Sequence, residues 1–301
     1  MSFPYLGDLL HAVLGMSLPL PIPMFGLFVA LAVVLATRTF ALQVRHAEAL
    51  GRLSAGAHQL AGDLAAITLL AGIAGARVFH ILDHLPEFAA DPASFVFSRG
   101  GFSIYGGLFF GVAAGVWFLH RRSIPVLPML DSVAPALLLG YAVGRLGCQV
   151  SGDGDWGIAA NLALKPGWLP TWFWAQTYQG NILGEVIPPP GVYPTPIYES
   201  MAAFLMFSIL QRVAIRPRSV GCIFALYLLC TGFERLLIEK IRVNPRLDFL
   251  GFTFTQAELI SVCLIALGTG MLIGALPRKR RWLRLCVPLG LIALLSACVA
   301  I

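Results

Sequence analysis

The sequence predicts an all-α polytopic membrane protein with seven to eight transmembrane helices and a polar site formed at its outer-face loops. Hydrophobic residues make up 58% of the 301 residues and charged residues only 12%, whereas soluble domains carry roughly 25% charged residues. The apolar residues gather in eight segments near the ~20 residues that span a bilayer. We therefore expect a single integral membrane domain, residues 1–301, and no nucleic-acid partner despite the net charge of +6.

Each expected span is a mostly apolar run bounded by loops rich in charges, prolines or glycines. The third run is short, and the additional C-terminal helix, about 283–301, ends the chain, so whether it spans is left open. Residues 1–23 lack a basic region and a clear cleavage site, so we do not expect a cleaved signal peptide. The eight segments are 23–42, 60–82, 104–119, 127–147, 196–213, 220–241, 257–276 and 283–301.

The orientation follows from lysine and arginine in the loops. One alternating set of loops carries thirteen basic residues and the other set five. The positive-inside rule places the richer set in the cytoplasm. With eight spans, both termini then face outward.

Three arginines, Arg77, Arg145 and Arg235, lie within or at the ends of spans on the outer side. A charge at membrane depth costs at least ~2.5 kcal/mol, which makes it a functional-site hypothesis, although helix-end snorkelling explains any one of them. Arg145 opens the glycine-rich run 144–157 (GRLGCQVSGDGDWG), which also contains Asp153 and Asp155. Irregular backbone at this depth must be buried in protein or line a watery cavity, so this run predicts the wall of a polar site.

The run 99–107 (RGGFSIYGG) opens the third span and places two Gly-Gly pairs around Tyr105. Exposed amides at a helix start bind anions, so the turn is a candidate cradle for a phosphate. Glycine-mediated helix packing is the structural alternative. The sequence leaves both interpretations open.

The run 232–242 (GFERLLIEKIR) is a third group of candidate site residues, in which Arg235 and Glu239 share one helix face. Glu234 is about 100° around the helix, so we expect it to face elsewhere. A buried Arg–Glu pair can be structural, but guanidinium forks also bind phosphate in a bidentate manner. With Arg145 nearby, a phospholipid headgroup is the expected ligand. No metal-ligand spacing is present, so we expect no metal.

The loop of about 151–194 is rich in aromatic residues, which suits the headgroup layer. Its segment 165–174 (KPGWLPTWFW) is predicted to be an interfacial loop or half-helix, which either anchors the loop at the interface or covers a lipid access site. Tyr198 and Glu199 then enter the membrane edge at the fifth span. Asp131 either caps the fourth helix or faces the bundle interior.

Taken together, these motifs resemble the bacterial prolipoprotein diacylglyceryl transferase family over residues 24–274. The resemblance rests on the order and spacing of several motifs. They are Phe25-Gly26, Gly75-Ala-Arg77, the Gly100–Gly107 turn with Leu108 and Gly111, Asp131, Gly144-Arg-Leu-Gly147 with Gly152, Pro194 with Tyr198-Glu199, and Gly232 through Arg235 to Glu239 and Arg242.

The resemblance implies a bacterial inner-membrane enzyme that transfers the diacylglyceryl group of phosphatidylglycerol to the lipobox cysteine thiol of prolipoproteins. Glycerol 1-phosphate leaves, and no cofactor is used. By this resemblance Arg145 and Arg235 hold the phosphate, Arg77 and Glu239 support the site, and Glu199 and Asp131 order it. The candidate catalytic residues are Arg145, Arg235, Tyr105 and Glu239, and the candidate substrate-binding residues are Arg77, Gly100, Gly101, Gly106, Gly107, Asp131, Gly144, Gly147, Gly152, Asp153, Tyr198 and Glu199.

The sequence departs from the family pattern at several polar positions. Tyr105 stands where histidine is common, Cys148 and Ser151 replace asparagines, Asp153 replaces glutamate and Phe25 replaces tyrosine. The general base is then Asp153, Asp155 or a histidine of the pair His80 and His84, unless no dedicated base is needed, and Cys148 is a candidate nucleophile of its own. The alternatives to the transferase are a paralogue with another donor or acceptor, and a non-catalytic lipid-binding or transport protein.

Overall fold

The computed structural model describes residues 2–15, 20–97, 101–215, 219–249 and 252–275. It is mostly helical, and four of its helices are long and apolar enough to cross a bilayer, which confirms a polytopic membrane protein. These are Met24–Ala49, Ala57–Asp83, Val126–Ser151 and Gln256–Ala275. The chain divides into two compact units, Met1–Ala36 with Val133–Ile301, and Thr37–Ser132. The expectation of a single membrane domain stays a prediction.

The expected spans 23–42 to 257–276 coincide with helices to within a few residues, except that the first continues to Ala49. The matching elements are α2 (Met24–Ala49), η1 (Ala57–Leu60) with α3 (Ala61–Asp83), α6 (Ile104–Arg121), α7 (Val126–Ser151), α9 (Thr195–Ala214), α10 (Cys222–Glu239) and α11 (Gln256–Ala275). The eighth expected segment, 283–301, lies outside the described residues.

Several elements were not expected from the sequence. They are α1 (Leu6–Leu14), the short helices α4 (Leu85–Ala90), α5 (Pro92–Phe97) and η2 (Leu162–Leu164), and the antiparallel hairpin of β1 (Arg246–Phe249) and β2 (Phe252–Thr255). The short helix α8 (Thr171–Trp174) lies in the segment 165–174, which was predicted to be a loop or half-helix. All are short, so they give little periodic signal. The hairpin matters for the site because it follows α10 directly.

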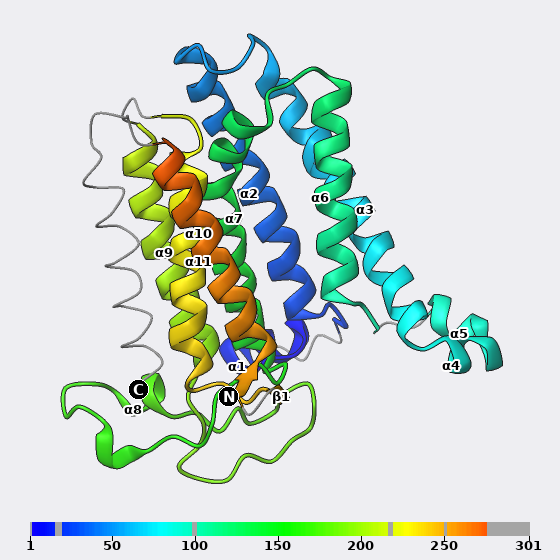
Figure 1. The fold of residues 1–301 in the computed structure, drawn as a ribbon. Helices are drawn as coiled ribbons and strands as arrows, with labels where there is room; N and C mark the ends of the chain where they lie inside the picture. Colours follow the sequence, from blue (N-terminus) through cyan, green and yellow to red (C-terminus); the bar gives the residue numbers. More distant parts are fainter. Residues whose placement is uncertain (1, 16–19, 98–100, 216–218, 250–251, 276–301) are drawn as a thin grey trace. The chain divides into compact units, whose positions relative to one another are not determined.

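In the first unit, α7, α9, α10 and α11 lie side by side (Figure 1). Small residues on α7 and α9 allow close contact between these helices. Ala134, Leu138 and Ala142 of α7 pack with Ala203 and Leu210 of α9, and all five are fully buried. The Ser200 hydroxyl also donates a hydrogen bond of 2.9 Å to the carbonyl of Ala142. This packing fixes the ends of α7 and α9 next to each other.

The connection from α7 to α9 folds back on itself through short backbone bridges. Gly157 pairs with Arg242, and Val192 pairs with both Ala159 and Gln176. Tyr178 is the largest fully buried side chain, and its hydroxyl donates to Gln149 of α7 at 2.7 Å. The connection is therefore tied to the helix ends rather than hanging from them.

In the second unit, α3 packs against α6 through glycines. A Cβ on Gly106 would lie 2.3 Å from the carbonyl oxygen of Gly75, and one on Gly75 would lie 2.6 Å from the carbonyl of Gly106. Gly107 likewise approaches Gly72 and Ala76. Gly106 and Gly107 therefore make room for the packing of α6 against α3. This agrees with the interpretation of these glycines as helix-packing residues.

Gly106→Ala is expected to destabilise the protein by about 1–3 kcal/mol, because the added methyl group has no room beside the backbone of α3. The matched control is Gly62→Ala, also helical, where a Cβ meets nothing within 4 Å. The control should be neutral or slightly stabilising, since alanine is the better helix former. Thermal unfolding in detergent measures both, and equal effects would contradict the packing assignment.

Candidate functional site

A buried carboxylate, Glu199 of α9, lies at the centre of an ion-pair cluster in the first unit. Its side chain is 0% exposed. It pairs with Arg145 of α7, with Arg235 of α10 at 3.3 Å and with Arg242, just after α10, at 3.2 Å. Three helix ends therefore meet at one carboxylate.

Two further carboxylates complete the cluster. Asp155 pairs with Arg145 through Oδ2 and with Arg242 through Oδ1, the latter at 2.6 Å. Glu239 pairs with Arg235 at 3.1 Å, one helical turn away on α10. The expectation that Arg235 and Glu239 share a helix face is confirmed. The Asn244 amide also donates to Glu239 at 2.7 Å, so both ends of the Glu239 carboxylate are held.

The position of Arg242 depends on the backbone of the connection that follows α7. Gly157 and Arg242 form an isolated antiparallel β-bridge, and the Ile158 amide donates to the Ile241 carbonyl at 2.8 Å. A Cβ on Gly157 would lie 2.4 Å from that carbonyl, so only glycine permits this approach. On the other side, the Thr195 hydroxyl donates to the Asp155 carbonyl at 2.6 Å. These contacts hold Asp155 and Arg242 opposite each other.

The cluster balances three guanidinium groups with three carboxylates, and access to it is uneven. The side chains of Glu199 and Glu239 are closed to solvent, whereas that of Arg235 is 27% exposed and that of Asp155 35%. Arg145 is buried and its Nε has no hydrogen-bond partner among the described residues. Arg235 and Asp155 are therefore the members of the cluster that are most accessible to an anionic ligand.

Asp155 lies in the connection, just outside the helix. Burial alone would raise the pKa of its carboxyl, but the charges of Arg145 and Arg242 and their hydrogen bonds outweigh it and lower the pKa below the usual aspartate range. A carboxylate stabilised in this way is a poor proton acceptor. The hypothesis that Asp155 is the general base therefore loses its physical basis.

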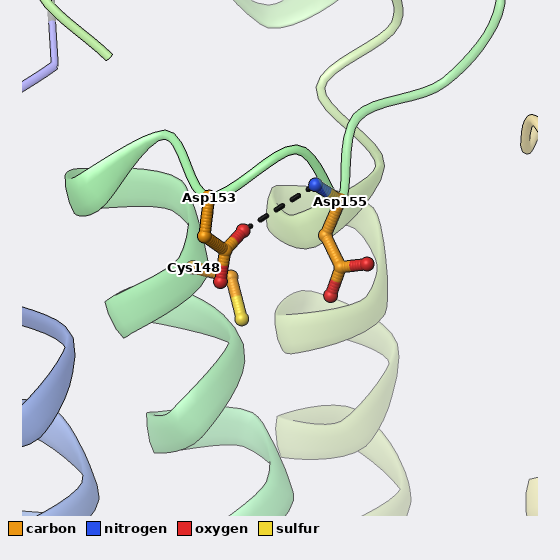
Figure 2. Close-up of side chains that lie close together, drawn as sticks. All are labelled: Cys148, Asp153 and Asp155. Carbon is orange, nitrogen blue, oxygen red and sulfur yellow. Dashed lines mark hydrogen bonds between the residues drawn. The ribbon is translucent and has the colours of Figure 1, made fainter. Parts of the chain in front are cut away.

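Cys148, Asp153 and Asp155 lie together at the end of α7, with their potential ligand atoms within 4.8 Å of one another. Figure 2 shows the three side chains, with the Asp155 amide donating to Asp153 at 3.3 Å. The spacing in the sequence did not suggest this grouping. However, Arg145 donates to both Asp155 and the Cys148 sulfur, the latter at 3.4 Å, so guanidinium groups already supply the positive charge here.

The rest of the 144–157 run is helical for longer than expected, because α7 continues to Ser151. Gly144 and Gly147 therefore lie within the helix, and Gly147 packs against Phe28 of α2. The irregular backbone begins at Gly152, whose φ of 63° favours glycine. Tyr198, expected at the site, donates its hydroxyl to the Phe173 carbonyl at 2.6 Å and so fastens α8 to α9.

The other candidate residues belong to the second unit. Arg77 donates to the Gly101 carbonyl at 2.9 Å, and its guanidinium carbon lies 4.7 Å from the Phe102 ring centroid, so it holds the two residues that lead into α6. Tyr105, near the start of α6, is half exposed. Asp131 is buried inside α7 rather than capping it. Gly100 lies outside the described residues. The substrate roles of these residues stay predictions.

Two members of the cluster, Asp155 and Arg242, were not predicted as ion-pair partners: Asp155 was a candidate general base, and Arg242 was named only as part of the family motif. Arg242 follows Arg235 by seven residues, or about two helical turns. This spacing indicates that the two arginines lie on the same side of the helix. Asp155 gave no comparable signal, because its position depends on the fold of the connection. Glu234, expected to face elsewhere, joins no ion pair of the cluster but is itself buried.

A family model described as prolipoprotein diacylglyceryl transferase matches residues 12–274. The chain belongs to the prolipoprotein diacylglyceryl transferase family. The match covers the whole cluster and most of both units, so the resemblance noted from the motifs is confirmed.

Individual relatives agree with this assignment. A phosphatidylglycerol–prolipoprotein diacylglyceryl transferase of Leptospira interrogans is 32% identical over 200 residues, which span 58% of this chain and 58% of that protein. One of Chromohalobacter salexigens is 32% identical over 216 residues, covering 70% and 74%. One of Gloeobacter violaceus is 29% identical over 227 residues, covering 70% and 76%.

Glu199→Gln is expected to destabilise the protein by about 3–5 kcal/mol, since it leaves buried guanidinium groups without their shared carboxylate. The matched control is Glu258→Gln. Glu258 pairs with Lys240 at 3.9 Å, and both side chains are partly exposed, so its loss should cost about 0–1 kcal/mol. Thermal and denaturant unfolding compare the two, and similar losses would contradict the central place of Glu199.

The Asp155 ion pairs are expected to make stability depend on pH. Because the folded-state pKa is lowered, the pairs stabilise the fold fully above about pH 4, the ordinary aspartate pKa. That contribution is lost as the pH falls from there through the lowered pKa. The unfolding temperatures of wild type and Asp155→Asn should differ at pH 7 and converge below pH 4. A difference that stays constant over this range would refute the assignment.

Proposed function

We propose that this protein transfers the diacylglyceryl group of phosphatidylglycerol to the lipobox cysteine thiol of prolipoproteins and releases glycerol 1-phosphate. Its family membership supports the reaction class, and the names of its relatives supply the two substrates. The observation that carries the proposal is the meeting of three arginines at Glu199. Such a set of forked donors suits a phosphate ester.

The chemistry needs help chiefly at the leaving group. The cysteine sulfur forms a C–S bond to the glyceryl carbon as the bond from that carbon to the phosphate oxygen breaks, and the thiol proton passes to a base or to water. Negative charge then gathers on the departing glycerol phosphate. In the proposed site Arg145 and Arg235 stabilise it, because fixed donors in a site shielded from water act strongly on developing charge.

The carboxylates have a different role in this proposal. Glu199 and Glu239 hold the guanidinium groups in fixed orientations before the lipid arrives, and Asp155 is the partner that the phosphate displaces most readily, since it is the most exposed of the three. Arg77, Tyr105 and Asp131 keep the roles that the resemblance implies. Two reactants held by one membrane also lose less entropy on reaction.

We further propose that seven or eight helices span the bacterial inner membrane with the N-terminus outside. The basic loops support this orientation. The cluster then lies toward the outer leaflet, where the C-terminal ends of α7 and α10 and the start of α9 meet. Exposed Trp168 and Trp172 in the connection suit the headgroup layer on the same side.

A paralogue with another thiol or lipid substrate is the alternative, and Cys148 is the observation that favours it. Its sulfur lies against Arg145 at a position where the family pattern has asparagine. A different side chain in contact with Arg145 can change which ligand Arg145 binds. The same assay, repeated with other phospholipids and acceptor peptides, separates the two proposals.

The purified protein in lipid nanodiscs is expected to convert a lipobox peptide and phosphatidylglycerol into a thioether-linked peptide and glycerol 1-phosphate, seen by mass spectrometry. Arg145→Ala and Arg235→Ala should each reduce kcat at least about 10²-fold, as loss of one transition-state donor does. Arg246→Ala, an exposed arginine of β1, is the control and should keep full activity. If the wild-type protein makes neither product, the proposal fails.

A further inference from the structure

One buried carboxyl group of the first unit is left out of the ion-pair cluster. Asp155, Glu199 and Glu239 are each paired with arginine. Glu234 of α10 is only 9% exposed, and its Oε1 has no hydrogen-bond partner among the described residues. Buried polar atoms in folded proteins are nearly always hydrogen-bonded, so this atom requires an explanation.

Glu234 lies close enough to the cluster to act on it. It interacts electrostatically with Arg235, Arg145 and Arg242, and with Tyr141 of α7. The Tyr141 ring centroid lies 5.9 Å from the guanidinium carbon of Arg145. Glu234 is therefore a neighbour of the arginines that we assign to the phosphate.

The cluster itself contains an unsatisfied donor that belongs to no ion pair. Arg145 Nε is buried and finds no acceptor in the described part of the chain. One unpaired donor on α7 and one unpaired acceptor on α10 thus belong to the same group of side chains. A ligand that accepts at one point and donates at a neighbouring point would satisfy both.

A phosphoglycerol headgroup has this pattern, since its phosphate oxygens accept and its free hydroxyl groups donate. We propose that Glu234 determines donor specificity by accepting a hydrogen bond from a hydroxyl of the lipid headgroup, while Arg145 Nε donates to the adjacent phosphate. This inference rests on the proposed transferase function. A carboxyl oxygen accepts whether or not the group is protonated, so the contact does not depend on the charge of Glu234.

Binding must open the cluster, because both atoms are closed to solvent in the free protein. The phosphate enters at the exposed edge of Arg235 and Asp155 and takes over contacts that the carboxylates now make. The headgroup hydroxyl then reaches the acceptor on α10. A lipid without this hydroxyl leaves the acceptor unpaired in the bound state, and a site built to bind a hydroxyl discriminates strongly against an analogue that lacks it.

The test compares two donors with identical acyl chains, phosphatidylglycerol and phosphatidylpropanol, whose headgroup lacks hydroxyl groups. For each donor, kcat/KM is measured with a lipobox peptide in nanodiscs, and Kd without the peptide. Wild type should favour phosphatidylglycerol by at least about tenfold in both measurements, as expected for one unpaired buried acceptor.

Two substitutions isolate the acceptor. Glu234→Met keeps similar volume but removes the oxygen, so the preference should fall to near one, mainly by loss with phosphatidylglycerol. Glu234→Gln keeps an acceptor oxygen and should retain most of the preference. Glu258→Gln, outside the cluster, should leave the ratio unchanged.

Three outcomes would overturn the inference. They are a wild-type protein that does not distinguish the two donors, a Met variant that keeps the preference, and Met and Gln variants that lose activity equally with both donors, which would indicate a proton-transfer or purely structural role. If the Met variant does not fold, Glu234→Leu, which also lacks the acceptor oxygen, takes its place in the same comparison. If wild type transfers nothing from either lipid, the proposed function fails, while the Kd ratio still tests Glu234.

Discussion

The burial of Glu199 among three arginines is the interaction on which the rest of this structure depends. A carboxylate removed from water is very costly unless it is paired and hydrogen-bonded. Here the partners come from α7, α10 and the segment after α10. These segments must therefore end at the same place. Small residues between α7 and α9 make this close approach possible.

The same constraint explains the connection between α7 and α9. Arg145 and Arg242 each need more than one acceptor, and Asp155 supplies it. The Gly157 bridge and the Thr195 hydroxyl hold that carboxylate in place. Because the arginines are already oriented by their carboxylates, an arriving phosphate meets prearranged donors, which is the condition for strong electrostatic stabilisation. The stabilising network and the proposed lipid site are thus one set of atoms.

Hydrophobicity alone was enough to predict most of the helices. An apolar segment long enough to cross a bilayer must satisfy its own backbone hydrogen bonds, and a helix does so within the segment. The end of α7 was misplaced by four residues because glycines at 144 and 147 suggested a break, whereas Gly147 only makes room for Phe28. The hairpin after α10 and helix α1 are too short for periodicity to predict. Arg145 and Arg235 were found from their charge at membrane depth, Glu239 from the helix face that it shares with Arg235, and Glu199 from its place at the membrane edge and the family motif.

Asp155 was considered as a general base but not as an ion-pair partner, because its partners are set by the folded connection, which no local pattern encodes. Glu234 joins no ion pair of the cluster, in keeping with its angle around α10, but that angle did not reveal that it is buried. The 99–107 turn had two possible roles in the sequence, and contact with α3 assigns Gly106 and Gly107 to packing. Long-range contacts, rather than residue types, decided each of these cases.

The central claim is that the Glu199 cluster holds the headgroup of an anionic phospholipid. An experimental structure of the wild-type protein in nanodiscs with phosphatidylglycerol tests it most directly. The account predicts phosphate oxygens within hydrogen-bond distance of the Arg145 and Arg235 guanidinium groups, with Glu199 still buried between them. A headgroup bound elsewhere, with every ion pair of the cluster intact, would contradict it.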